Sequence, residues 1–278
     1  MALVAVPLIP IYNMDKKTDL LRIALLQMDV QWQQPQTNRL HAEQVLGTAP
    51  QADLYLLPEM FTTGFAVQPQ GVAEPFRNHG SDTLEWMQAM AGRLHAAVAG
   101  SVAVEEGGRY YNRFCFVYPD ARCVCYDKHH LFTYGGEHTC YTPGHDRVVL
   151  DYRGVRFQLQ VCYDLRFPCF VRNNADHPYD VILYVANWPQ SRMNAWHTLL
   201  QARAIENQCY VAAVNRVGTD PQCVYSGGSC LVSAKGEVVA QAATTGECVV
   251  MGEADLSALR RFRRKFPVLH DADGASSW

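Results

Sequence analysis

The sequence of 278 residues contains no apolar run near the roughly 18 residues that a membrane-spanning helix needs. It also lacks an excess of either charge, because 24 basic side chains oppose 27 acidic ones and leave a net charge of -3. A broad electrostatic field that would attract nucleic acid or an anionic membrane is therefore excluded. Hydrophobic residues make up 49% of the chain, which is enough for a substantial core. We expect a globular protein that binds neither nucleic acid nor membrane.

The N-terminal stretch MALVAVPLIPIYN has no basic region at its start and no small-residue cleavage site at its end, so it does not have the pattern of an export signal. We interpret residues 1–20 as an extended arm that packs on the body. No internal repeat or shift in composition divides residues 21–264, which we expect to form a single domain, followed by a tail over residues 265–278. This organisation predicts a cytoplasmic protein.

Ten cysteines are a high count, but they are scattered through apolar segments rather than clustered as in a small disulfide-linked scaffold. We expect most of them to be reduced thiols in the core. Cys123 and Cys125, followed by His129 and His130, raise the alternative of a zinc site. Zinc-binding pairs have two to four intervening residues and a second matching pair, whereas one residue separates these two cysteines. We therefore predict no metal site.

Apolar residues recur with the period of strands in some segments and of helices in others, which predicts an α/β protein with mixed sheets. Helices are expected over residues 40–46, 81–98 and 195–208. Ser81 is the expected N-cap of the second helix. We predict that residues 229–242 form one strand. The apolar faces of the first two helices are expected to consist of Leu40, Val45 and Leu46, and of Leu84, Met87, Ala91, Leu94 and Val98.

Three predicted strands end in the same way, with a reactive side chain after an apolar run. These side chains are Glu59 in LYLLPEMF, Lys128 in CVCYDKHHLF and Cys162 in LQVCYDLRFP. In open α/β sheets, ligands bind outside strand ends, where loops surround the site. A thiolate is stabilised by a nearby ammonium, and a carboxylate can accept the thiol proton. The sequence thus predicts one pocket that combines a base, a cation and a nucleophile.

The three segments resemble the signature motifs of the nitrilase, or carbon-nitrogen hydrolase, superfamily, and they occur in that family's order. The resemblance extends from about residue 21 to residue 255. It implies a four-layer αββα sandwich of two mixed β-sheets flanked by helices, and a homodimer. It also implies an enzyme that needs no metal, nucleotide or organic cofactor.

Position by position, the resemblance implies that Cys162 attacks the substrate carbon, Glu59 acts as general base and then acid, and Lys128 stabilises the oxyanion. The backbone N–H of Tyr163 would complete the oxyanion hole. Glu137 in YGGEHTCYTPG matches the family's second glutamate, which orients the lysine and the substrate.

The segments GGEHTCYTPG and NWPQSRMNAWHTLLQARAIENQ resemble most closely the omega-amidase branch, which hydrolyses the side-chain amide of 2-oxo dicarboxylic acid monoamides such as 2-oxoglutaramate and 2-oxosuccinamate. A substrate carboxylate needs a cation, for which Arg192 is the first candidate and His138 the second. Trp188 and Phe65 are candidates for the pocket wall. Asp164 and Arg166 are expected to pair with each other or with neighbouring loops, and carboxylate binding is the alternative role of Arg166.

Three alternatives remain open from the sequence. The first is another carbon-nitrogen hydrolase, namely a nitrilase, a carbamoylase or a deaminated-glutathione amidase. The second is a thiol redox or metal-binding protein, which would use the ten cysteines. The third, a noncatalytic binding module, would require the loss of Glu59, Lys128 or Cys162, and all three are present.

Overall fold

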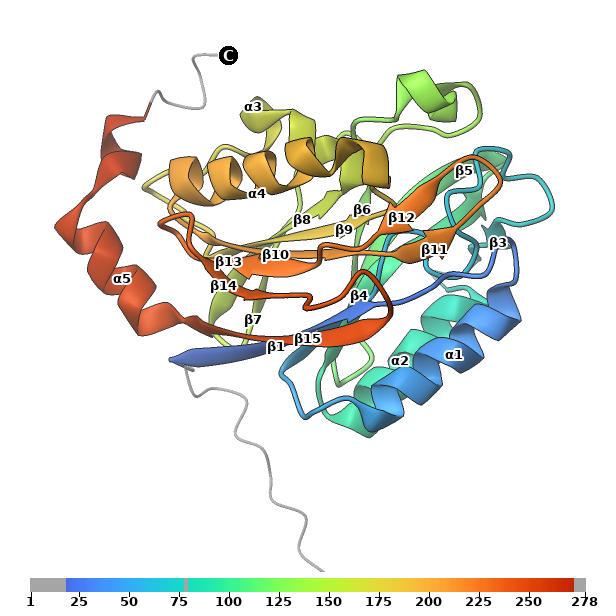
Figure 1. Ribbon diagram of the computed structural model, residues 1–278, viewed down its shortest axis with the longest axis horizontal. Coiled ribbons are helices and arrows are strands. Elements are labelled where there is room, and N and C mark those ends of the chain that lie inside the picture. The colour runs from blue at the N-terminus through green and yellow to red at the C-terminus, as the bar shows by residue number, and fades with distance from the viewer. Residues whose placement is uncertain (1–18, 78–79, 273–278) are drawn as a thin grey trace, which may run out of the picture.

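The computed structural model describes residues 19–77 and 80–272, which contain two large mixed β-sheets (Figure 1). The first sheet has the strand order β15-β1-β2-β4-β5-β6, and a short strand β3 pairs with β4. Strands β1, β2 and β4 run parallel, whereas β15, β5 and β6 add antiparallel pairs. The strands are β1 (Leu20–Gln27), β2 (Leu54–Leu56), β3 (Glu74–Pro75), β4 (Ala97–Glu106), β5 (Arg109–Val117), β6 (Cys123–Asp127) and β15 (Cys248–Asp255).

The second sheet has the order β14-β13-β10-β9-β8-β7, with parallel strands β8, β9 and β10 at its centre. A separate hairpin, β11 (Val217–Thr219) with β12 (Val224–Ser226), follows β10. The strands of the second sheet are β7 (Val149–Tyr152), β8 (Val155–Val161), β9 (Val181–Ala186), β10 (Tyr210–Asn215), β13 (Cys230–Val232) and β14 (Val238–Gln241).

Helices cover the outer faces of the two sheets. Helices α1 (Pro35–Thr48) and α2 (Asp82–Leu94) pack on the first sheet, and α4 (Met193–Asn207) packs on the second, near the short α3 (Pro168–Val171) (Figure 1). Helix α5 (Leu256–Lys265) follows β15. The predicted fold class, an α/β sandwich of two mixed sheets flanked by helices, is confirmed.

The main core lies between the sheets, because strand side chains alternate between two faces and both inner faces are apolar. Leu25 on β1 and Leu159 on β8 both belong to the inter-sheet cluster, whereas Leu26, the next residue on β1, packs under the outer helices. Both faces of each central strand are therefore buried, and the strand ends are the places where polar side chains can collect.

The apolar face predicted for the first helix is partly wrong. Helix α1 begins at Pro35, and its buried side consists of Asn38, Ala42 and Leu46, whereas Leu40 is 57% exposed. Asn38 is buried because its side chain accepts from the N–H of Gln31 and donates to two carbonyl oxygens. Hydrogen bonds that fix the entry of the helix thus override the apolar pattern.

Two predicted boundaries also need correction. Ser81 caps α2 as predicted, since its hydroxyl accepts from the N–H of Leu84 at 3.3 Å, but the helix ends at Leu94 and Val98 belongs to β4. Residues 229–242 form two antiparallel strands, β13 and β14, rather than one. Gly236 permits the turn between them, because its φ of +82° is a conformation that side chains other than glycine rarely adopt.

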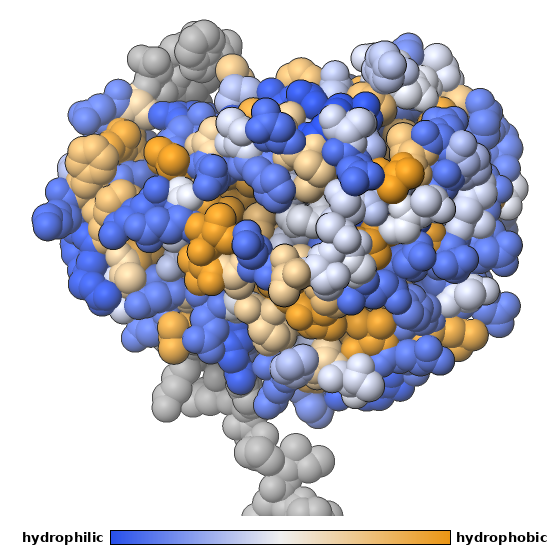
Figure 2. Space-filling model, in the orientation of Figure 1, coloured by the Kyte–Doolittle hydropathy of each residue, from blue (hydrophilic) through white to orange (hydrophobic). Residues whose placement is uncertain are grey.

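Most of the predicted N-terminal arm, residues 1–18, lies outside the described residues, as do residues 273–278 of the predicted tail. Within the described part of the chain, no helix is long and apolar enough to cross a membrane. On the face that Figure 2 shows, hydrophobic side chains form small groups among hydrophilic ones.

Candidate active site

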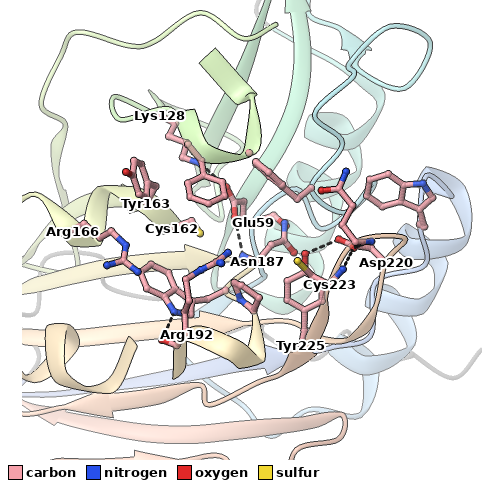
Figure 3. A pocket seen from close by; sticks show the side chains of 17 residues that line it. Glu59, Lys128, Cys162, Tyr163, Arg166, Asn187, Arg192, Asp220, Cys223 and Tyr225 are labelled. Atoms are coloured by element: carbon pink, nitrogen blue, oxygen red, sulfur yellow. Dashed lines mark hydrogen bonds and ion pairs between the residues drawn. The ribbon is translucent and has the colours of Figure 1, made fainter. Parts of the chain in front are cut away.

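The three predicted reactive residues meet at the ends of strands from both sheets (Figure 3). Glu59 follows β2, and Lys128 follows β6 directly, so both come from the first sheet. Cys162 follows β8 of the second sheet and begins the 3-10 helix η3 (Cys162–Arg166). All three line one pocket, which brings together residues from three distant segments of the chain.

Lys128 lies between two buried glutamates. Its Nζ is 3.0 Å from Oε1 of Glu59 and 2.9 Å from Oε2 of Glu137, and all three side chains are almost completely inaccessible to solvent. Glu137 lies in the short 3-10 helix η2 (Glu137–Thr139), after η1 (Thr133–Gly135), and also accepts from the N–H of Phe132. The lysine is therefore held at a fixed position by two carboxylates.

The pKa of Lys128 reflects this position. Burial alone would lower the pKa of the ammonium, but the charges of Glu137 and Glu59 outweigh burial and raise it above its usual value. Burial raises the pKa of the Glu137 carboxyl, while the Lys128 ammonium acts in the opposite direction. The lysine stays charged at neutral pH and presents a buried positive charge to the pocket.

Two asparagines that the sequence analysis did not single out complete this network. The Nδ2 group of Asn112, on β5, donates to Oε1 of Glu59 at 2.8 Å and to Oε1 of Glu137 at 3.3 Å. The backbone N–H of Asn187 donates to Oε2 of Glu59 at 2.8 Å. The sequence does mark Asn112 as a buried hydrogen-bonding residue, because it is polar and lies within the mostly apolar strand RYYNRFCFV. The sequence alone does not reveal its partners.

Cys162 has a backbone conformation that is unusual for a residue with a side chain, with a φ of +45°. Burial raises the pKa of its thiol well above the ordinary value, the nearby Glu59 carboxylate raises it further, and Lys128 opposes them. The resting group is therefore a neutral thiol beside a carboxylate that can accept its proton.

The turn after Cys162 is held by Asp164 rather than by an Asp164–Arg166 pair. The buried carboxylate of Asp164 accepts from the N–H of Val161 at 3.0 Å, from the hydroxyl of Tyr126 at 2.8 Å and from the N–H of His130 at 2.9 Å. These partners connect the turn to β6 and the loop after it. Asp164 therefore pairs with a neighbouring loop, which is one of the two arrangements that the sequence analysis allowed.

Two arginines line the same pocket. Arg166 lies 4.9 Å above the ring of Trp188, and Arg192, at the end of the 3-10 helix η4 (Gln190–Arg192), lies 5.4 Å from the ring of Phe132. Neither guanidinium forms an ion pair with a carboxylate among residues 19–77 and 80–272. Figure 3 places Arg166 and Arg192 on the Cys162 side of the pocket.

The two predicted wall residues and His138, the second candidate for binding the substrate carboxylate, differ in their positions. Phe65 and Trp188 line the pocket, and Lys128 lies 5.4 Å from the Phe65 ring, whereas His138 is exposed and is not part of the lining. Another part of the pocket wall comes from Trp32 and from the β11–β12 hairpin. The residues that the hairpin and its turn contribute are Asp220, Gln222, Cys223 and Tyr225. The sequence contained no recognisable signal for this wall, because a short hairpin can lie against many surfaces.

Comparison with known proteins agrees with this geometry. The family model described as carbon-nitrogen hydrolase matches residues 22–264. The chain is 44% identical over 254 residues to the omega-amidase YafV of Yersinia enterocolitica, covering 91% of this chain and 97% of that protein. It is 33% identical over 253 residues to the 2-oxoglutaramate amidase of Bacillus subtilis, covering 90% of this chain and 96% of that protein.

Among solved structures, the chain is similar to XC1258 from Xanthomonas campestris, described as a CN-hydrolase superfamily protein with an arsenic adduct in the active site. The TM-score is 0.88, the identity is 41%, and the match covers 92% of this chain and 98% of that one. The strand order, the residues at the strand ends and the similarity to these proteins all indicate the same family. The chain belongs to the carbon-nitrogen hydrolase family.

Proposed function

We propose that this enzyme releases ammonia from the side-chain amide of small 2-oxo dicarboxylic acid monoamides, such as 2-oxoglutaramate and 2-oxosuccinamate, through a thioester on Cys162. The observation that carries the proposal is the placement of Glu59, Lys128 and Cys162 in one pocket with two arginines that have no acidic partner among the described residues. The names of the relatives from Yersinia and Bacillus support this substrate class.

In the proposed acylation step, Glu59 accepts the thiol proton and the sulfur of Cys162 attacks the amide carbon. The negative charge on the carbonyl oxygen is stabilised by Lys128 and by the backbone N–H of Tyr163. Collapse of the tetrahedral intermediate breaks the C–N bond, and Glu59 returns the proton to the departing ammonia. The product on the enzyme is a thioester.

In the proposed deacylation step, Glu59 accepts a proton from a water molecule, which attacks the thioester carbon. The C–S bond breaks, the diacid leaves, and the proton returns to the sulfur. Glu137 positions Lys128 in both steps, because its carboxylate contacts the ammonium through both oxygens, at 2.9 and 3.1 Å. The residues of the chain supply every proton transfer in this scheme.

We propose that Arg192 and Arg166 bind the substrate carboxylate. Each guanidinium lies over an aromatic ring and has no carboxylate partner among the described residues, which leaves its N–H groups available for a bidentate contact with a carboxylate. A neutral amide of the same length would leave both charges unpaired. The pocket therefore favours an amide whose other end is an anion.

Arg192→Ala is expected to raise KM for 2-oxoglutaramate by roughly 10- to 100-fold, which is the loss of one charge-assisted hydrogen-bonding partner. For a neutral amide of similar length, KM should change far less, because that substrate makes no contact with the guanidinium. Ammonia release measured for both substrates in the wild-type and variant enzymes checks this difference.

The comparison variant for this measurement is His138→Ala, since His138 is exposed outside the pocket and should leave both KM values nearly unchanged. Equal losses of Arg192→Ala on the two substrates would reject the carboxylate-binding role. The same assay extended to a nitrile, a carbamoyl amino acid and deaminated glutathione tests the substrate class. A higher kcat/KM for any of these three would contradict the proposed function.

Glu59→Gln is expected to separate thiol reactivity from turnover. Burial and then the Glu59 charge raise the pKa of Cys162, so removal of that charge lowers the thiol pKa and increases the thiolate fraction at a given pH. The pH profile for alkylation by iodoacetamide should therefore move to lower pH. Turnover should nevertheless fall by about 10²- to 10⁴-fold, because the general base is lost.

Glu137→Gln is the matched control, since Glu137 lies beyond Lys128 and is not among the principal causes of the thiol pKa shift. It should move the alkylation profile less than Glu59→Gln. An alkylation profile that moves to higher pH in Glu59→Gln would be inconsistent with the electrostatic account of this thiol.

A homodimer and a cytoplasmic location also belong to this proposal. The homodimer is supported by the resemblance to the family, and both stay predictions. Sedimentation equilibrium of the purified chain would test the dimer directly.

A further inference from the structure

Three cysteines on the first sheet form a cluster outside the active site. Cys115 on β5 lies directly opposite Cys125 on β6, and Cys123 is two residues before Cys125, so all three side chains point to the same face of the sheet. The Sγ atoms of Cys115 and Cys125 are 3.9 Å apart, and those of Cys123 and Cys125 are 3.6 Å apart. All three sulfurs lie within 4.8 Å of one another.

This face is the one that the outer helices cover, and the active site lies on the other side of the strand. The apolar cluster between the first sheet and helices α1 and α2 includes Cys115, Cys123 and Cys125, whereas Tyr126 packs between the two sheets. Lys128 therefore projects toward the pocket, away from the three sulfurs. The thiol cluster has no part in the proposed hydrolysis.

The histidines that follow β6 do not belong to the cluster. The ring of His129 contacts the carbonyl oxygen of Gly144 at 2.7 Å and stacks on Phe170. His130 contacts Asp164 at 2.8 Å and stacks on Phe167. Within the described part of the chain, no histidine or carboxylate joins the three thiols as a fourth ligand.

The spacing of the sulfurs matches three-coordinate metal binding. A metal–sulfur bond of about 2.3 Å places three ligands of a trigonal site about 4.0 Å apart. Two of the three separations, 3.6 and 3.9 Å, differ from this value by only a few tenths of an ångström, and the third, between Cys115 and Cys123, is within 4.8 Å. A structural zinc ion prefers four ligands, whereas soft thiolates also select Cu(I), which accepts three.

We propose that Cys115, Cys123 and Cys125 form a binding site for a single Cu(I) ion. Cys115 is buried at the base of the site, and Cys123 and Cys125 are partly exposed on β6, the edge strand, which gives the ion a path from solvent. Arg113, two residues before Cys115 on the same face, lies near the sulfurs, but its charge is already paired with Asp127 at 2.7 Å and Glu106 at 2.8 Å, so the proposal depends on the arrangement of the three sulfurs. Binding forms three Cu–S bonds and releases the thiol protons to the solvent.

The binding experiment uses the full chain with Cys162→Ala, so that the active-site thiol does not compete for copper. The reduced protein is titrated anaerobically with Cu(I) in competition with a chromophoric Cu(I) chelator. We expect one copper ion per chain, and X-ray absorption should find three sulfur ligands at about 2.3 Å. Addition of Cys123→Ser or Cys125→Ser should abolish this stoichiometric binding.

Cys169→Ser is the matched control, because Cys169 is an exposed thiol outside the cluster and its replacement should leave copper binding unchanged. Circular dichroism establishes that each variant is folded, and both serine substitutions in the site are at partly exposed positions. Copper binding that survives Cys125→Ser, coordination by only two sulfurs, or tighter binding of Zn²⁺ would overturn the proposal. A failure to hydrolyse oxo-acid amides would not affect it, since the assay measures no turnover.

Discussion

Cys162→Ala is expected to lower kcat for ammonia release by roughly 10⁴-fold or more, since no thioester can form without the sulfur. The chain should fold normally. Cys162 lines the pocket and is only partly buried, and an alanine at this position has to adopt the same backbone φ of +45° as the cysteine. Steady-state ammonia release, together with thermal unfolding of both proteins, measures the two effects separately.

Replacement of Cys162 by serine is a second test of whether its sulfur is the nucleophile. Cys162→Ser keeps a nucleophile of similar shape, but a hydroxyl is far less acidic than a thiol, so Glu59 would have to remove a much more tightly held proton. We expect this variant to be almost as inactive as the alanine variant. Mass spectrometry of quenched wild-type reactions should find the acyl group on the peptide that contains Cys162.

The matched control is Cys169→Ala, which makes the same substitution at an exposed thiol on α3. Its kcat should remain that of the wild type. Full activity in Cys162→Ala would exclude a cysteine mechanism at this position, and an acyl group on another cysteine would assign the nucleophile elsewhere.

The sequence was sufficient to predict the positions of the three reactive residues, because each follows a strand whose end the apolar pattern defines. Strands β6 and β8 end directly before Lys128 and Cys162, and β2 ends at Leu56, three residues before Glu59, as the pattern of apolar runs indicated. The resemblance to the carbon-nitrogen hydrolases then predicted both the fold class and the family, and both are confirmed. Local sequence was informative here because strand boundaries are encoded locally.

The hydrogen bonds that fix these residues could not be predicted, because they join segments that only the tertiary fold brings together. Asn187 lies on the loop after β9 of the second sheet, yet its N–H holds Glu59 of the first sheet. Asn38 became part of a buried helix face for a similar reason, since its partners are the backbone groups of Gln31 and Thr62. A polar residue in an apolar setting indicates a partner but does not identify it.

The cysteine cluster illustrates the same limit. Cys123 and Cys125 were disfavoured as metal ligands because no second pair follows the required spacing along the chain. The third sulfur comes from Cys115 on the neighbouring strand, and only the β5–β6 register places it opposite Cys125. Ligands that converge across a sheet leave no short motif in the sequence.

Lys128→Met is expected to impair both catalysis and stability. Methionine has a similar length but no charge, so the variant loses an oxyanion donor, which should lower kcat by about 10²- to 10³-fold. It also leaves Glu59 and Glu137 as two buried carboxylates without their ammonium, and removal of one partner of a buried ion pair destabilises a protein by roughly 3–5 kcal/mol. Ammonia release and denaturant unfolding measure these two losses. A loss of kcat below tenfold would count against the assigned role.

The instability of Lys128→Met should depend on pH in a defined direction. Without the ammonium, mutual repulsion and burial hold the pKa of one carboxyl in the folded variant above its unfolded value of about 4.3. A group with a raised folded pKa stabilises the protein below its unfolded pKa, and this stabilisation disappears as pH rises through the folded pKa. The free energy of unfolding that Lys128→Met loses relative to wild type should therefore be small near pH 4 and grow toward neutral pH.

The double variant with Glu137→Gln tests this explanation. It removes one of the two carboxylate charges, so it should restore much of the stability at neutral pH without restoring kcat, because the oxyanion donor is still missing. If the loss of unfolding free energy in Lys128→Met instead shrinks as pH rises, the two carboxylates do not repel each other in the folded variant.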